Sequence, residues 1–132
     1  MAEHCIITYC CRDKDPAPGL LLAIKRYRSD RIQSLYRQAI EEGSGFLIFS
    51  GQFGLLRPDE EIPWYDHMLQ PEEIPAMILK ICGPLGRYDA ATFYYREGDN
   101  IASYLEAIRT AADRTAVTLT ERGHSPTLQH SE

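Results

Sequence analysis

The residues with the clearest chemical potential stand at the start of a long polar stretch. Ser50 is followed by Gly51 and Gly54, two glycines three positions apart that could bring the main-chain amides close to an anion. Arg57 comes next, and its planar guanidinium suits a carboxylate or a phosphate. The pattern lacks the lysine of a Walker sequence and the third glycine of a dinucleotide fingerprint. A second interpretation therefore stays open, in which the glycines form a tight turn and Arg57 pairs with a nearby glutamate.

Later in the same stretch, four consecutive residues have side chains suited to ligand recognition and proton transfer. Trp64 and Tyr65 offer aromatic faces on which a base could stack, and Asp66 and His67 are candidate general bases. Residues 57–68 show no helical or strand period, and loops of that length in a compact domain are more often functional than not. The structural alternatives are a Trp64 that fills the core and a His67 that caps a helix or lies on the surface.

The charged residues are segregated along the chain. The formal net charge of -5 means that the whole molecule does not attract polyanions, so any contact with nucleic acid needs a local basic patch. Such a patch is expected within residues 12–37, whose basic members are Arg12, Lys14, Lys25, Arg26, Arg28, Arg31 and Arg37. We expect Arg26, Arg28 and Arg31 to face a nucleic-acid backbone.

The cysteines do not have the spacing of a metal site. Cys10 and Cys11 are adjacent, which is poor geometry for two ligands of one tetrahedral metal, and no CxxC or HxxxH spacing occurs. We therefore expect no metal and no other cofactor. Cys10 ends an apolar run close to Arg12 and Lys14, so its thiol is a candidate ligand contact or nucleophile. The alternative is a structural thiol, as most are.

Apolar patterns place the expected secondary structure. Short apolar or β-branched runs predict strands at residues 4–10, 45–50, 88–95 and 116–120. Apolar residues at helical spacing predict helices over 29–42, ended by Gly43, over 71–82, ended by Gly83 and Pro84, and from a cap at Asp99 or Asn100 to Ala112. Residues 20–27 form either a helical turn or a loop.

The alternation of these strands and helices predicts the fold class. We expect an α/β fold with three layers, in which helices cover both faces of a mostly parallel four-stranded sheet. Ligands of such sheets bind at the carboxyl ends of the strands. The segments that leave those ends are 11–18, 51–70 and 96–100, so the functional residues are expected there.

The length and composition fit one domain. We expect a single α/β domain over residues 1–120 and a flexible tail over 121–132, because that last segment is polar and aperiodic. The first residues show no basic leader and no apolar signal core, and no apolar run approaches the roughly 18 residues that cross a bilayer. These features predict a cytoplasmic protein with reduced thiols and no membrane contact.

A family resemblance covers the same glycine-containing stretch. The run Ser50-Gly51-Gln52-Phe53-Gly54-Leu55-Leu56-Arg57-Pro58, followed by Ile62 and Tyr65, resembles the central signature of the bacterial peroxide-stress-response protein family. Residues 65–68 are closer to short uncharacterised relatives of that family, and residues 9–14 and 26–29 resemble segments of those relatives more loosely. The resemblance implies a shared fold core, a functional loop at 50–58, and an association with DNA binding and with protection of DNA during oxidative stress.

Two classes of function fit these residues. In the first, the protein binds a nucleotide, a nucleobase or a nucleic-acid end through Gly51, Gly54 and Arg57 for phosphate and through the aromatic pair for the base. Whether it is also an enzyme stays open; hydrolysis or transfer at a glycosidic or phosphate bond would use Asp66 or His67 as the base. In the second, residues 62–65 form an apolar patch for a protein partner or for a homodimer.

Overall fold

The computed structural model describes residues 3–124 and contains a five-stranded sheet, a two-stranded sheet and four helices. The larger sheet has the strand order β4-β3-β1-β6-β7. Four of its strands run parallel: β1 (His4–Tyr9), β3 (Gly45–Ser50), β6 (Ala90–Arg96) and β7 (Thr118–His124). The α/β class and the mostly parallel sheet are therefore confirmed.

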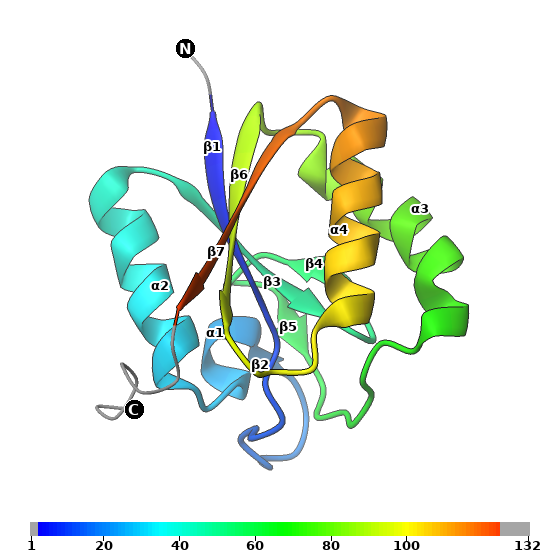
Figure 1. Cartoon of the computed structure of the whole chain (residues 1–132). Coiled ribbons are helices and arrows are strands. Elements are labelled where there is room, and N and C mark those ends of the chain that lie inside the picture. The colour runs from blue at the N-terminus through cyan, green and yellow to red at the C-terminus, as the bar shows by residue number, and fades with distance from the viewer. Residues whose placement is uncertain (1–2, 125–132) are drawn as a thin grey trace.

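Helices lie on both faces of this sheet (Figure 1). Helix α2 (Asp30–Glu42) covers one face, together with the single turn α1 (Ala23–Arg26). Helices α3 (Ile74–Leu85) and α4 (Ala102–Thr115) pack against each other and cover the opposite face. Two apolar clusters, one on each side of the sheet, make up the core. The central strands β1 and β3 contribute to both, which explains their apolar runs without alternation.

A fifth strand, β4 (Gly54–Leu56), was not expected and corrects the prediction of four strands. Gly54 has a φ of 82°, a left-handed conformation that glycine adopts without strain, and it lets the chain turn back on β3. Leu55 and Leu56 then pair antiparallel with Phe49 and Ile48. A chain reversal this short cannot be told from an irregular loop by apolar periodicity, because only three residues are paired.

Two helix boundaries also differ from those expected. Residues Pro71–Glu73 form a short 3-10 turn, η1, and α3 begins only at Ile74. Its C-terminal end lies at Leu85, beyond the expected stop, because Pro84 sits in the last turn and removes only one main-chain hydrogen bond there. Helix α4 begins at Ala102 without a side-chain cap, so the capping role expected of Asp99 or Asn100 is wrong.

The last described strand is longer than predicted. Strand β7 pairs with β6 along its whole length, ending with His124 opposite Arg96. Residues 121–124, which were expected in a flexible tail, therefore belong to the sheet. The guanidinium of Arg109 helps to hold them, since its Nε and Nη2 both donate to the Glu121 carboxylate at 2.6 Å. The remainder of the expected tail, 125–132, lies outside the described residues.

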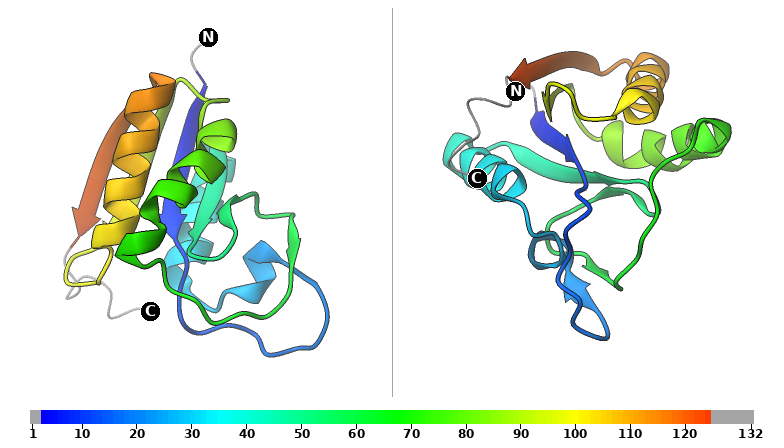
Figure 2. Two further views of the ribbon diagram at one scale, coloured as in Figure 1. Left: turned by 90° about the vertical axis from the view of Figure 1, so that its right-hand side faces the viewer. Right: turned by 60° about the horizontal axis from the view of Figure 1, so that its bottom comes forward.

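The second sheet lies beyond the carboxyl ends of the parallel strands. Strands β2 (Leu21–Leu22) and β5 (Glu61–Ile62) pair antiparallel and join the segment after β1 to the segment after β4. Both views of Figure 2 show these two segments leaving the sheet at the same end. Within residues 3–124, none of the helices has the length and apolar character needed to span a membrane.

Arg26 connects these segments from inside. Its side chain is fully buried, and its two terminal nitrogens donate to the carbonyl oxygens of Asp15, Ala17, Gly19 and Ile62 at 2.7 to 3.0 Å. The first three carbonyls belong to the loop after β1, and the fourth belongs to β5. Arg26 was expected to bind a ligand in a basic patch; burial instead leaves it no surface for one.

We expect Arg26→Gln to lower the free energy of unfolding by about 3 kcal/mol or more, because glutamine cannot reach all of these carbonyls and leaves several buried acceptors unpaired. Urea denaturation measures this change. Arg37→Gln is the matched control, since Arg37 is exposed and its side chain bonds only to Ser34 within residues 3–124; a change within about 0.5 kcal/mol is expected there. Equal stability of the two variants would contradict the structural role of Arg26.

Candidate functional site

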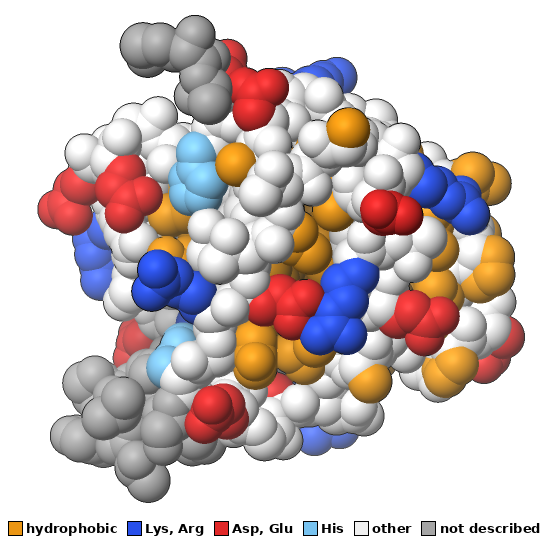
Figure 3. All heavy atoms as spheres, turned by 45° about the horizontal axis from the view of Figure 1, so that its top comes forward, with side chains coloured by type: hydrophobic (Ala, Val, Ile, Leu, Met, Phe, Trp, Pro, Cys, Tyr) orange, Lys and Arg blue, Asp and Glu red, His pale blue; other side chains and the backbone are white. Residues whose placement is uncertain are grey.

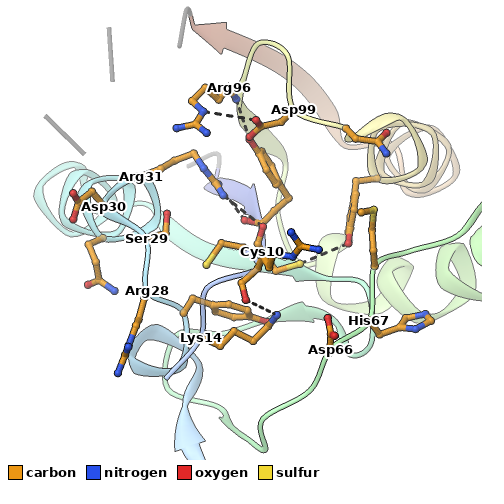
Figure 4. Close-up of a pocket in the computed structure, with 18 residues that line it drawn as sticks. Cys10, Lys14, Arg28, Ser29, Asp30, Arg31, Asp66, His67, Arg96 and Asp99 are labelled. Atoms are coloured by element: carbon orange, nitrogen blue, oxygen red, sulfur yellow. Dashed lines mark hydrogen bonds and ion pairs between the residues drawn. The ribbon is translucent and has the colours of Figure 1, made fainter. Parts of the chain in front are cut away.

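A cavity of about 880 Å³ opens at the carboxyl ends of β1 and β6 (Figure 4). This position follows from the topology. The connection after β1 leads through α2 to β3 on one side, whereas the connection after β3 leads through α3 to β6 on the other side of β1. Loops that diverge in this way leave a crevice between β1 and β6, which is where open α/β sheets bind ligands.

Five basic side chains line this cavity, against three acidic ones. The basic residues are Arg12, Lys14, Arg28, Arg31 and Arg96, and the acidic residues are Asp30, Asp66 and Asp99. In contrast, the face shown in Figure 3, where the amino ends of the strands come forward, carries both signs intermixed. The cavity is therefore a basic concave surface, in a protein whose formal net charge is -5.

Three of these five cations, Arg12, Lys14 and Arg31, have no carboxylate partner within residues 3–124, and the first two of them are not buried. Arg12 is exposed and forms no ion pair there. Lys14 is half-buried, and its Nζ lies 4.6 Å from the ring centroid of Tyr65 and 5.9 Å from that of Tyr27. Positive charge held over aromatic rings without a counter-ion attracts an anionic ligand. Arg28 is nearly as available, since its contact with Asp15 measures 3.9 Å between exposed groups.

Arg31 has a different role from the one predicted for the basic cluster. Its side chain is buried and donates to the Oγ1 of Thr8, to the Tyr9 carbonyl at 3.1 Å and to the Cys10 carbonyl at 3.5 Å. Its guanidinium also lies 3.8 Å from the centroid of the Tyr9 ring. Arg31 thus fixes the end of β1 that forms the cavity wall.

A hydrogen-bonded group orders the opposite wall, shown at the top of Figure 4. The hydroxyl of Tyr9 donates to the Asp99 carboxylate and accepts the backbone N–H of Arg96 at 3.1 Å. The same carboxylate pairs with the Arg96 guanidinium at 3.7 Å. Burial raises the pKa of Tyr9 to about 12, so its hydroxyl is protonated at neutral pH and remains a donor.

Cys10 lies in the cavity, as predicted from its place after the first strand. Its Sγ is 3.6 Å from the hydroxyl of Tyr104, which in turn accepts the backbone N–H of Leu69 at 3.2 Å. The neighbouring Cys11 also lines the cavity, and burial raises the pKa of its thiol to about 11. Cys11 is therefore a protonated, weakly reactive thiol at neutral pH.

The glycine loop does not form an anion cradle. The Oγ of Ser50 accepts the backbone N–H groups of Gln52 at 3.1 Å and of Phe53 at 3.0 Å, so these amides are already occupied. A Cβ added to Gly51 would lie 2.6 Å from the backbone nitrogen of Leu69, which shows that this glycine lets two protein segments approach each other. Gly54 provides the turn into β4. The tight-turn interpretation therefore replaces the anion-binding one.

The other residues predicted along this stretch divide into two groups. Tyr65 is buried, and its hydroxyl bonds to Ser50 and Tyr27, so its ring is not a free stacking surface. Arg57 pairs with Asp59 and Glu60 at 3.6 and 3.4 Å, outside the cavity lining. Trp64 is 52% exposed and also lies outside that lining.

Asp66 and His67 do line the cavity, as expected of the segment that carries them. The Asp66 carboxylate is exposed and has no bonded partner within residues 3–124. The His67 ring points away from the cavity centre, with Nε2 at 2.8 Å from the Glu73 carboxylate. A hydrogen bond from the Gln70 backbone, followed by the one from His67, holds the pKa of Glu73 below its usual range. This arrangement belongs to the cap of η1.

Several cavity residues were not predicted as site residues. Tyr9, Tyr27, Tyr104 and Asp99 all line the cavity. Tyr9 and Asp99 could have been found, because each stands at or just after the end of a predicted strand. Tyr104 was not predicted because its helical spacing is that of a core residue. Tyr27 was not predicted because it lies in residues 20–27, for which both a helical turn and a loop were possible. Within the described residues, no group of three or more histidine, cysteine, aspartate or glutamate side chains could hold a metal ion.

Comparison of the chain with protein-family models, with curated proteins and with solved structures finds no match. The resemblance to the peroxide-stress-response family therefore stays a prediction, and the argument about function has to be made from the cavity.

The role of Gly51 gives a direct test of the loop. We expect Gly51→Ala to destabilise the fold by about 2 kcal/mol or more, since the added methyl group would meet backbone atoms of Leu69 and His67 within 2.8 Å. Gly83→Ala is the matched control, because a Cβ there meets nothing within 4 Å and alanine favours a helix. Thermal melting of both variants measures the difference, and a neutral Gly51→Ala would rule out the close approach.

Proposed function

We propose that the cavity between β1 and β6 binds a nucleotide, a nucleobase or the end of a nucleic acid. The observation that carries this proposal is the pair of cations, Arg12 and Lys14, that enter a switch-point cavity without a carboxylate partner in the described chain. A phosphate would neutralise them, and Arg28 lies on the same lining.

The remaining lining suits the rest of such a ligand. The cavity of about 880 Å³ falls within the usual range for small-molecule sites. Its walls include the buried aromatic side chains of Tyr9, Tyr27 and Tyr104, which make part of the wall apolar. The loop residues first expected to bind phosphate, Gly51, Gly54 and Arg57, do not enter into this proposal.

Asp66 is the candidate base if the bound molecule is also a substrate. Its carboxylate is exposed at the cavity and unbonded within residues 3–124, whereas His67 is paired with Glu73. Hydrolysis or transfer at a glycosidic or phosphate bond is the chemistry that we propose for it. A role in peroxide stress rests only on the resemblance of residues 45–68 and stays a prediction.

The binding proposal is tested by removing the two unpaired charges. We expect the double variant Arg12→Gln with Lys14→Gln to weaken nucleoside monophosphate binding by roughly 10-fold or more, since a hydrogen bond to a charged group contributes about 1.5–3 kcal/mol net and each 1.4 kcal/mol is about a factor of 10 in affinity. Isothermal titration at low salt measures the affinity, and raising the salt concentration should narrow the difference.

The matched control is the double variant Lys25→Gln with Arg87→Gln, which removes the same charge from exposed positions outside the cavity lining. Its affinity should equal that of the unchanged protein. Equal losses in both double variants would mean that only the net charge matters, and absence of nucleotide binding by the unchanged protein would refute the proposal.

The exposed apolar side chains near residue 64 support a second proposal, self-association of the protein. Of residues 62–65, Ile62 and Tyr65 are buried in the core, but Trp64 is 52% exposed and Met68, nearby in sequence, is 49% exposed. Exposed large apolar side chains favour a contact with another protein surface. We propose a homodimer through this surface as the alternative function.

Sedimentation of the unchanged protein and of Trp64→Ala tests this alternative. A dimer that dissociates in the variant is expected if the Trp64 surface is the interface. Leu79→Ala is the control, because Leu79 is 73% exposed and belongs to α3 and not to residues 62–68. A monomer at micromolar concentration in the unchanged protein would eliminate the dimer.

A further inference from the structure

The outer side of α3 is an exposed surface that carries no charge. Figure 1 shows this helix at the edge of the molecule, with α4 on its inner side. Four exposed residues recur on the outer side at helical spacing, and we call them the α3 face: Pro75, Ala76, Leu79 and Gly83. Leu79 is 73% exposed, which is the largest exposed fraction among the large apolar side chains of residues 3–124.

The charged residue of α3 is directed away from this face. The Nζ of Lys80 donates to the carbonyl oxygen of Gln52, in the turn between β3 and β4, at 3.3 Å. In contrast, the other two long helices expose several charged side chains. These are Asp30, Arg37, Glu41 and Glu42 on α2, and Glu106, Arg109, Asp113 and Arg114 on α4. The α3 face therefore differs from the other outer helix surfaces and fits contact with a protein.

The residues of the α3 face are arranged symmetrically about its centre. Ala76 and Gly83 lie equally far along the chain from the point midway between Leu79 and Lys80. The same holds for Glu72 in η1 and for Arg87, which follows the end of α3. Both of these charged residues are exposed, and neither forms an ion pair within residues 3–124. One end of the face thus carries a negative charge and the other end a positive charge.

We propose that the α3 face binds the α3 face of a second copy of this chain, with the two helices antiparallel about a twofold axis. Every contact then occurs twice, because the same surface is used by both copies. The two Leu79 side chains lie next to the axis. Ala76 of one copy faces Gly83 of the other, and these small residues let the helices approach closely. Glu72 of one copy faces Arg87 of the other at both ends.

The charges favour a second copy as the partner. A helix with an acid at one end and a base at the other is complementary to its own antiparallel copy, whereas a parallel arrangement would bring like charges together. The inference does not rest on the proposed function. None of the residues 71–87 lines the cavity, so the dimer contact and the nucleotide would use separate surfaces.

Removal of the central leucine tests the contact. Sedimentation equilibrium over a range of protein concentrations gives the dissociation constant of the dimer. Leu79→Ala should raise this constant roughly 100-fold, because both copies lose apolar contact. Trp64→Ala is the matched control, since Trp64 is also exposed and apolar but lies outside α3, and it should leave the constant unchanged. A dimer through Trp64 predicts the reverse result for this pair of variants.

An exchange of charges tests the antiparallel register. Glu72→Arg alone and Arg87→Glu alone each place like charges opposite each other at both ends, so each should weaken the dimer roughly 10-fold at low salt. The double variant restores opposite charges and should bind within about 3-fold of the unchanged protein. An effect of net charge alone would move the two single variants in opposite directions, because one reduces the negative net charge and the other increases it.

Three results would overturn the inference. The first is an unchanged protein that stays monomeric up to about 1 mM. The second is a dimer that Leu79→Ala does not weaken, and the third is a double variant that fails to regain affinity. Thermal melting checks that the variants fold, as expected for exposed positions. Nucleotide titration of Leu79→Ala should match that of the unchanged protein, which separates the fate of the dimer from that of the proposed function.

Discussion

The hydrogen bonds of the buried Arg26 guanidinium hold together the loops at the carboxyl ends of the parallel strands. An ionised group away from water is costly unless hydrogen bonds replace its hydration, and here two nitrogens donate to four carbonyl oxygens from two separate segments. The same bonds satisfy carbonyls that an irregular loop cannot pair within itself. Residues 15–19 are thereby ordered without regular secondary structure. Of the three guanidinium nitrogens of Arg26, only Nε has no hydrogen-bond partner within residues 3–124.

This anchoring explains how a loop can present cations to a ligand. Lys14 lies one residue before the anchored segment, and it forms an isolated antiparallel bridge with Tyr27, the residue after Arg26. The backbone that carries Lys14 is held on both sides, so its ammonium is positioned over the tyrosine rings before a ligand arrives. A preorganised site loses less conformational entropy on binding than a mobile loop would. The hydrogen bonds of Arg26 thus help to position Lys14, the residue proposed to bind the ligand.

The sequence predicted the scaffold better than the site. Apolar runs placed the four parallel strands, and Ser29 and Gly43 bounded α2 as expected, because buried strands and capped helices leave local patterns. The prediction of the site was wrong where polar residues are buried. Arg26, Ser50 and Tyr65 look like ligand-binding residues in the sequence, but each is bonded inside the fold by groups that are distant along the chain. Local patterns do not show such partners, so burial of a polar residue could not be foreseen.

The glycine loop shows why the chemistry of a motif depends on what its backbone approaches. A glycine at the carboxyl end of a buried strand permits a close main-chain approach, and the approaching group can be a phosphate or another part of the protein. At Gly51 the space that a ligand would need is filled by the backbone near Leu69 and by the hydroxyl of Tyr104. Tyr104 also reaches Cys10, so the glycine lets this tyrosine bridge the loop and the end of β1. The glycine loop therefore supports the cavity wall and does not bind the ligand, and the cations without a carboxylate partner that could meet a ligand, Arg12 and Lys14, follow β1.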